Sequence, residues 1–212
     1  MKDFPVFTTE NGVASLVLKE IPYRRCAYII LRDSLEPEAL LAECISFCRA
    51  CGAERVFAAG HAFLQKYPLH TVVYGMRGEA VVDKEKLVCL FPVTEQTVDR
   101  WREIYNRRMD CVDNSATLTY LDENRILASG GAYFVHDHGE LLGIGWLEDT
   151  KILAMAAVRP GAGERVMHTL LSLVEGTVVS LEVASTNIRA IRLYEKLGFL
   201  KVEEISCWYL VG

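Results

Sequence analysis

Several hallmarks of common protein classes are missing from this sequence of 212 residues, whose net charge is −5. It has no stretch that approaches the ~18 consecutive apolar residues needed to span a membrane. Its start, "MKDFPVFTTENG", lacks a basic flank followed by an apolar run, so we expect no secretory signal and no membrane association. Nucleic acids call for a basic face, so the acidic balance argues against a nucleic-acid partner.

Cysteine is too sparse for a disulfide scaffold. The seven cysteines are an odd number, and without an export signal we expect free thiols in a reducing, cytoplasmic setting. Cys44, Cys48 and Cys51 would gather on one side of a helix, which leaves a metal site as an alternative. We favour core packing and expect no metal, because "ALLAECISFCRACG" has the spacing of an amphipathic helix.

The first part of the chain has the pattern of a small αβ lobe. Charged residues then interrupt the hydrophobic pattern near residues 77–86, and we place a domain boundary there. The predicted domains are residues 1–80 and 86–212. In the first, we expect strands at residues 13–21, 26–33, 55–60 and 70–76 and a helix at 36–52.

The second domain is predicted to have the order β-α-α-β-β-β-α-β-α-β. Alternating apolar residues around "HDHG" predict a β-hairpin with a glycine-bearing turn. The predicted helices are residues 95–111, with a cap near Thr94, then 115–129, 165–176 and a last one after Asn187; the predicted strands are 86–93, the hairpin within 131–147, 151–158, 178–184 and 202–211.

The stretch "AVRPGAGERVMHTLL" runs from a strand through a glycine loop into a helix. Unpaired backbone N–H groups at such a helix start form an anion site. Gly161, Ala162 and Gly163 have little side chain to block a phosphate, and the N–H groups near Glu164 and Arg165 would face it. The alternative is an ordinary connection between a strand and a helix, because a glycine pair alone is a weak signal.

Glu182 lies in the strand pattern "VVSLEVAS". Alternation sends Leu181 and Val183 to one face of the sheet and Glu182 to the other. A carboxylate there lies either in a cleft, where it is suited to act as a general base, or at the solvated end of the strand. The sequence leaves both interpretations open.

The next helix places Asn187, Ala190, Ile191 and Tyr194 on one face. Asn187 suits the N-cap, and Gly198 is placed to end the helix. By itself, Tyr194 has the spacing of a packing residue with a solvated hydroxyl.

The stretch from Leu181 to Phe199, "LEVASTNIRAIRLYEKLGF", resembles closely the motif that ends the acetyl-CoA-binding core of GNAT-type N-acetyltransferases. The preceding hairpin, strand, glycine loop and helix occur in the order of that family, so the resemblance covers roughly residues 86–212. It implies an α/β fold of the α+β kind: a mixed, mostly antiparallel central sheet flanked by helices. The N-terminal lobe is interpreted as a truncated, degenerate GNAT-like half that covers a sheet edge and lines the acceptor cleft.

The resemblance also implies a role for individual residues. Tyr194 matches the tyrosine that protonates the departing thiolate of coenzyme A, and Glu182 matches the base of members that acetylate protein N-termini. Asn187 would contact the cofactor or the reacting amide. The remaining cofactor-binding positions would act through their backbone: Ala156, Ala157 and Val158 toward the pantetheine arm, and Gly161, Ala162, Gly163, Glu164 and Arg165 toward the pyrophosphate.

The implied function is transfer of an acetyl group from acetyl-CoA to a primary amine of a small molecule or of a peptide N-terminus, by direct attack. The alternative is a non-catalytic acyl-CoA-binding or interaction module that keeps the fold. The loop "RPGAGERV" fits the family pattern only in part. Glu164 would oppose a pyrophosphate, with Arg165 as the nearby cation, so we expect weaker cofactor binding or a differently shaped loop.

Overall fold

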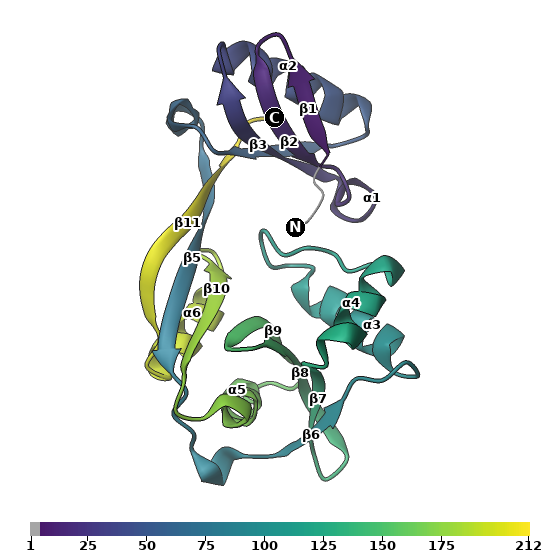
Figure 1. Ribbon diagram of the computed structural model, residues 1–212, viewed down its shortest axis with the longest axis vertical. Helices are drawn as coiled ribbons and strands as arrows, with labels where there is room; N and C mark the ends of the chain where they lie inside the picture. The colour runs from purple at the N-terminus through teal and green to yellow at the C-terminus, as the bar shows by residue number, and fades with distance from the viewer. Residues whose placement is uncertain (1–4) are drawn as a thin grey trace. The chain divides into compact units, whose positions relative to one another are not determined.

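The computed structural model describes residues 5–212, which form two compact units (Figure 1). The first unit comprises residues 5–73 together with Glu204–Gly212, and the second unit comprises Tyr74–Glu203. Two long strands, β5 (Leu69–Glu79) and β11 (Leu200–Leu210), belong in part to each unit.

The first unit is a sheet with the helix α2 (Pro37–Ala50) on one face. Its strand order is β1-β2-β3-β4 followed by the end of β11, which pairs antiparallel with β4 through Tyr209 and Ala58. Only β3 and β4 form a parallel pair among the pairs of this unit that the described residues define. Its elements are β1 (Val6–Thr9), β2 (Gly12–Val17), α1 (Ile21–Arg24), β3 (Cys26–Ser34), α2, β4 (Arg55–Ala59) and the short η1 (Ala62–Lys66).

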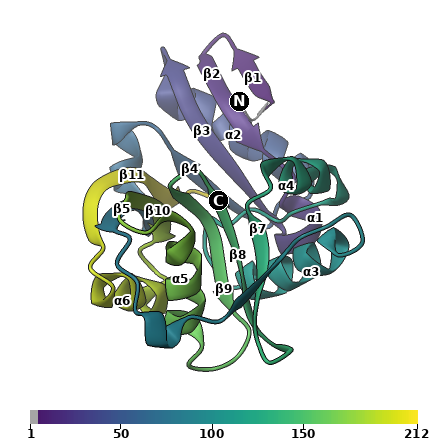
Figure 2. The same cartoon turned by 60° about the horizontal axis from the view of Figure 1, so that its bottom comes forward.

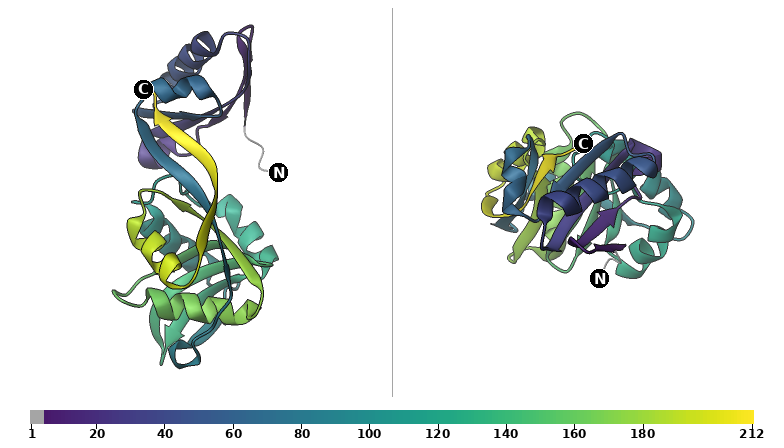
Figure 3. Two further views of the ribbon diagram at one scale, coloured as in Figure 1. Left: turned by 90° about the vertical axis from the view of Figure 1, so that its left-hand side faces the viewer. Right: turned by 90° about the horizontal axis from the view of Figure 1, so that it is seen from above.

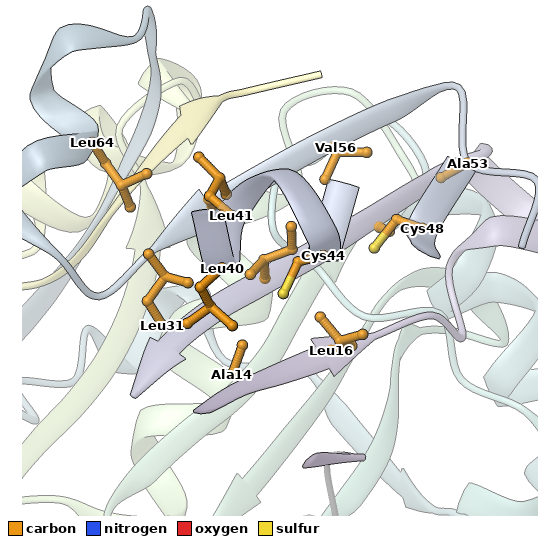
Figure 4. Packing of buried hydrophobic residues seen from close by; sticks show 13 residues of the cluster. Ala14, Leu16, Leu31, Leu40, Leu41, Cys44, Cys48, Ala53, Val56 and Leu64 are labelled. Atoms are coloured by element: carbon orange, nitrogen blue, oxygen red, sulfur yellow. The ribbon is translucent and has the colours of Figure 1, made fainter. Parts of the chain in front are cut away.

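Two of the three clustered cysteines are part of the first unit's core. Cys44 and Cys48 are fully buried among aliphatic side chains from α2 and the sheet, including Leu16 and Leu40 (Figure 4). Burial raises the pKa of the Cys44 thiol to about 12 and that of Cys48 to about 11, so both stay protonated. Cys51, by contrast, is exposed. Cys44 and Cys48 therefore pack in the core as predicted, whereas Cys51 does not. Among residues 5–212, no group of three or more His, Cys, Asp or Glu side chains is placed to hold a metal ion.

The second unit contains the predicted order of elements. The strands and helices are η2 (Lys84–Lys86), β6 (Cys89–Pro92), α3 (Val98–Met109), η3 (Tyr120–Asp122), α4 (Glu123–Ser129), β7 (Ala132–Asp137), β8 (Glu140–Glu148), β9 (Lys151–Ala157), α5 (Gly163–Leu171), η4 (Ser172–Val174), β10 (Val178–Ala184) and α6 (Ile188–Lys196), with the adjoining parts of β5 and β11. The predicted helix at residues 115–129 is wrong in length, because helical structure begins only at η3. The cap of α3 is Thr97 rather than Thr94.

Helices cover both faces of the second unit's sheet. The apolar sides of α5 and α6 pack with residues such as Leu181 and Val183, while α3 and α4 pack against the other face through Trp101 and Ile126 (Figure 2). Gly145 of β8 makes the close approach of α5 possible, because a Cβ there would lie 2.4 Å from Leu170 Cδ1. The predicted mixed, mostly antiparallel sheet flanked by helices is confirmed.

The strand β5 runs from one compact unit into the other. The sequence places the predicted strand, residues 70–76, in the N-terminal lobe, and within the second unit β5 lies between β10 and β11 (Figure 1). Figure 3 shows β5 in blue running along β11 in yellow. Gly78 permits this insertion, since the Phe199 ring occupies the place of its missing side chain, 2.8 Å from an ideal Cβ. The domains expected from the sequence, residues 1–80 and 86–212, remain a prediction.

Candidate active site

The second unit contains one pair of strands that separates along its length. β9 and β10 run parallel, but they pair at only two positions: Ser180 with Lys151, and Leu181 with Ile152. Beyond Ile152, β9 stays paired with β8 up to Ala157 and has no paired neighbour on its β10 side within residues 5–212. The Val158 N–H donates to the Leu142 carbonyl of β8 at 2.8 Å, so the backbone groups left for another partner are those near Ala157 that face away from β8.

The carboxyl end of β9 leads into the predicted anion loop. Gly161 adopts a left-handed conformation, with φ of +79°, and no atom lies within 4 Å of the position a Cβ would take. The loop ends at Ala162, and α5 begins at Gly163. The first N–H groups of this helix, those of Gly163, Glu164 and Arg165, have no carbonyl partner within the helix, so they are available to an anion.

Two lysines neutralise Glu164 in the first turn of α5. Its carboxylate accepts hydrogen bonds from Lys196 in the last turn of α6 and from Lys86 of η2, the latter at 2.7 Å. These hydrogen bonds, with Lys196 the larger contributor, lower the pKa of Glu164 to about 2. Arg165, the expected counter-charge, instead donates to Asp137 Oδ2 in the hairpin at 2.7 Å.

The amino end of α6 is built as the sequence predicts. The Asn187 Oδ1 atom accepts a hydrogen bond from the Ala190 N–H at 3.2 Å and so caps the helix. At the other end, Gly198 has φ of +86°, and the Phe199 N–H donates to the Tyr194 carbonyl at 3.0 Å. Asn187 thus has a structural role whether or not it also contacts a cofactor.

Tyr194 lies in the core between α6 and β10. It is 7 % exposed, and its ring packs at 6.2 Å from the ring of Phe199. Burial is the single cause that raises its pKa to about 12, and no residue in 5–212 forms a hydrogen bond with its hydroxyl. The hydroxyl is therefore protonated at neutral pH, and none of the described residues competes for its hydrogen bond.

Glu182 is the first residue of β10 beyond the paired segment. Its side chain is 46 % exposed and forms an ion pair with Lys151 at the start of β9. The apolar neighbours Leu181 and Val183 point to the core that contains Tyr194, so Glu182 points to the opposite face. The Glu182 carboxylate is therefore partly exposed and paired with a cation, and its role as a base remains a prediction.

Sequence reasoning missed the three lysines that contact these carboxylates. Lys86 belongs to the charged stretch in which the sequence places a domain boundary, and this stretch packs on α5: the Asp83 N–H donates to His168 Nδ1 at 3.2 Å. Lys196 lies inside the "LYEKLGF" motif, where spacing alone places it near the end of α6 but gives no indication of Glu164. Lys151 follows a turn and carries no local signal for Glu182.

Comparison with known proteins identifies the family. The model of the acetyltransferase (GNAT) family matches residues 84–199, more than half of the chain. The chain belongs to this family. The matched GNAT segment begins in η2 and ends at Phe199, so it includes the diverging strands, the glycine loop and all of α6.

Solved structures support the same fold for this GNAT protein. A functionally unknown conserved protein from Staphylococcus epidermidis has a TM-score of 0.61 at 10 % identity, with 99 % of this chain and 94 % of that chain covered. A GNAT-family acetyltransferase from Colwellia psychrerythraea has a TM-score of 0.55 at 14 % identity, with 98 % of this chain and 84 % of that chain covered. A GCN5-related N-acetyltransferase from Anabaena variabilis has a TM-score of 0.62 at 11 % identity, with 94 % of this chain and 59 % of that chain covered.

These structural similarities establish the fold alone, because the identities are low. No curated protein matches the sequence. Among the described residues, no helix is both long and apolar enough to cross a membrane.

Proposed function

We propose that this protein transfers an acetyl group from acetyl-CoA to a primary amine, of a small molecule or of a peptide N-terminus. The observation that carries the proposal is the divergence of β9 and β10 directly before the loop at Gly161 and the start of α5. An unpaired strand edge suits the amide-bearing pantetheine arm, and the helix start suits the diphosphate. When bound, acetyl-CoA supplies an activated thioester.

The side chains beside this divergence have the chemistry that the transfer needs. A primary amine is mostly protonated near neutral pH, so a base must remove a proton before the amine can attack. Glu182 supplies a carboxylate for this step. Little free energy is needed to break its ion pair with Lys151, because pairs between half-exposed side chains contribute about 0–1 kcal/mol to stability.

Tyr194 supplies the proton that the departing thiolate requires. Its ring is fixed in the core and its hydroxyl has no competing hydrogen bond among residues 5–212, so the proton is held ready for transfer. No covalent enzyme intermediate is needed for direct attack, and the cysteines therefore need no catalytic role.

The alternative function is an acyl-CoA-binding module without turnover, which is favoured by the partial fit of the loop "RPGAGERV" to the family pattern. If Glu182 stays with Lys151, the fold would bind an acyl-CoA without turnover. Two measurements separate these possibilities. Release of free thiol from acetyl-CoA with a panel of amines and peptides reports catalysis. A thermal-shift titration reports binding, since ligand at ~100 times its dissociation constant adds ~2.7 kcal/mol of stability. Stabilisation without thiol release across the panel supports the binding module, and the absence of both excludes the two functions together.

The Glu164 carboxylate is predicted to weaken binding of the diphosphate. We expect Glu164→Gln to tighten coenzyme A binding on the order of 10-fold, because it removes a negative charge and releases Lys86 and Lys196. Calorimetric titration with coenzyme A measures the change. The difference should persist from pH 8 to pH 5: a carboxyl with a pKa of about 2 stays charged above that value and loses its charge only as the pH falls through it.

Pantetheine is the matched control for this prediction, because it has the same arm without phosphates. Its affinity should be unchanged in Glu164→Gln. Equal affinities of the two proteins for coenzyme A, or equal changes for both ligands, would show that Glu164 does not act on the diphosphate.

A further inference from the structure

The segment that connects β5 to β6 is fastened to α5 at two points. The η2 segment, residues 83–88, contains η2 and lies beside α5 (Figure 2). The Asp83 N–H donates to His168 Nδ1 at 3.2 Å, and the Val88 N–H donates to Thr169 Oγ1 at 3.2 Å. Two consecutive side chains of α5 therefore hold the two ends of the η2 segment.

Both of these side chains are buried polar groups. His168 is 6 % exposed and Thr169 is 1 % exposed. A buried acceptor that loses its hydrogen bond is costly, so these two contacts hold the segment more firmly than exposed contacts would. The Thr169 hydroxyl donates to the Arg165 carbonyl at 2.7 Å, which fixes its direction. His168 Nδ1 accepts from a backbone N–H, so it carries no hydrogen of its own.

Between the two fastened ends, Lys86 extends to the start of α5. Its ammonium group lies 2.7 Å from Glu164 Oε2 and 3.6 Å from Asp83 Oδ2. The Lys86 side chain is 37 % exposed, and an ion pair at such a position is weak where a long, flexible side chain must be ordered. The docked η2 segment lowers this entropic cost, because it fixes the backbone from which Lys86 extends.

We propose that His168 and Thr169 are positioning residues for the cofactor, because they hold Lys86 at the start of α5. There the positive charge of Lys86 offsets Glu164 and so raises the affinity of the helix start for the diphosphate of coenzyme A. This inference rests on the proposed function, since it concerns the same helix start. Lys196 offsets Glu164 from α6, whereas Lys86 does so only while the η2 segment stays docked.

Lys86→Met is expected to weaken coenzyme A binding on the order of 10-fold, because Lys196 alone then offsets the Glu164 charge. Lys84→Met is the matched control: it removes the same charge from an exposed position of the η2 segment and should leave the affinity nearly unchanged. Pantetheine, which lacks the phosphates, should bind to wild type and to both variants equally. Calorimetric titration measures the affinity for each ligand.

The positioning role is tested on α5 itself. His168→Leu and Thr169→Val each remove one fastening, so each should weaken coenzyme A binding on the order of 3-fold to 10-fold. His168→Asn and Thr169→Ser keep a side-chain acceptor near the same place and should restore most of the affinity. In a Lys86→Met background, His168→Leu and Thr169→Val should have no further effect, because the lysine that they position is gone.

The outcomes separate this inference from the proposed function. Equal coenzyme A affinities of wild type and Lys86→Met would overturn the inference. So would a His168→Leu effect that is as large without Lys86 as with it, or that extends to pantetheine, because α5 as a whole would then be disturbed. In these cases release of thiol from acetyl-CoA with amines leaves the proposed function standing. If the affinities follow the expected pattern and no amine is acetylated, the inference stands and the proposed transfer fails. A wild type that binds no coenzyme A overturns both.

Discussion

Replacing Tyr194 with phenylalanine, or Glu182 with glutamine, is expected to lower kcat for acetyl transfer on the order of 10²-fold or more. The Tyr194→Phe change removes only the hydroxyl from a ring that the core holds in place. The Glu182→Gln change removes the negative charge of the carboxylate from an exposed side chain and leaves the alternation of the strand intact. Both proteins should therefore fold normally and bind coenzyme A with nearly unchanged affinity. Steady-state thiol release and a binding titration measure the two effects separately.

The pH profile adds a second readout for Tyr194. Burial raises the pKa of this phenol to about 12. The proton donor is therefore present below that value and is lost only as the pH rises through it. In wild type, kcat should show no decline due to Tyr194 up to about pH 10, the ordinary pKa of a phenol. A tyrosine that lost its proton near pH 8 or 9 would contradict this assignment.

Matched controls exist for both substitutions. Tyr209→Phe removes a hydroxyl from a partly buried ring that packs against the first unit's core, and Glu148→Gln removes a partly exposed carboxylate that is paired with Arg125 at 3.6 Å. Neither control should change kcat more than a few-fold. If Tyr194→Phe and Glu182→Gln retained full kcat while wild type was active, the family fold would stand and both role assignments would be wrong.

Replacing Gly145 with alanine is expected to destabilise the protein by about 1–3 kcal/mol. An added Cβ would lie 2.4 Å from both terminal carbons of Leu170, a fully buried residue of α5. The helix would have to move away from β8, and the N–H groups at its start would move with it. We therefore expect weaker coenzyme A binding together with the lower stability. Urea unfolding measures the stability, and titration with coenzyme A measures the binding.

A double-mutant cycle tests the cause of this destabilisation. Leu170→Ala alone should cost about 2–5 kcal/mol, because it leaves a cavity. The double variant Gly145→Ala, Leu170→Ala should cost less than the sum, because the new methyl group occupies space that the leucine has vacated. Strictly additive free energies of unfolding would show that the two positions do not press on each other.

The sequence predicted those features that a few neighbouring residues encode. The last helix is an example: Asn187 caps it and Gly198 ends it, as expected. The order of strands and helices in the second unit was also predicted, because apolar periodicity and turn residues act locally. The helix at residues 115–129 was overestimated, because most of its first half is held by Asn106 and by side chains of the loop instead of by helical hydrogen bonds.

Candidate side chains were predictable by type and position, while their surroundings were not. The motif from Leu181 to Phe199 identifies Glu182 and Tyr194, and the roles assigned to them remain predictions. The ion pair of Glu182 with Lys151 and the ring contact of Tyr194 with Phe199 form only in the folded chain. Glu164 is a similar case, because the sequence suggested Arg165 as its counter-charge and the structure provides Lys86 and Lys196.

The sequence by itself determined the family motif, the glycine loop and the two ends of α6, since each depends on residues a few positions apart. Only the tertiary structure decided that β5 enters the sheet beside β10, that two distant lysines neutralise Glu164, and that Arg165 pairs with Asp137 of the hairpin. The physical reason is that strand pairing, ion pairs and burial join residues far apart in the chain. Their energies depend on the whole packed arrangement, which no local pattern contains.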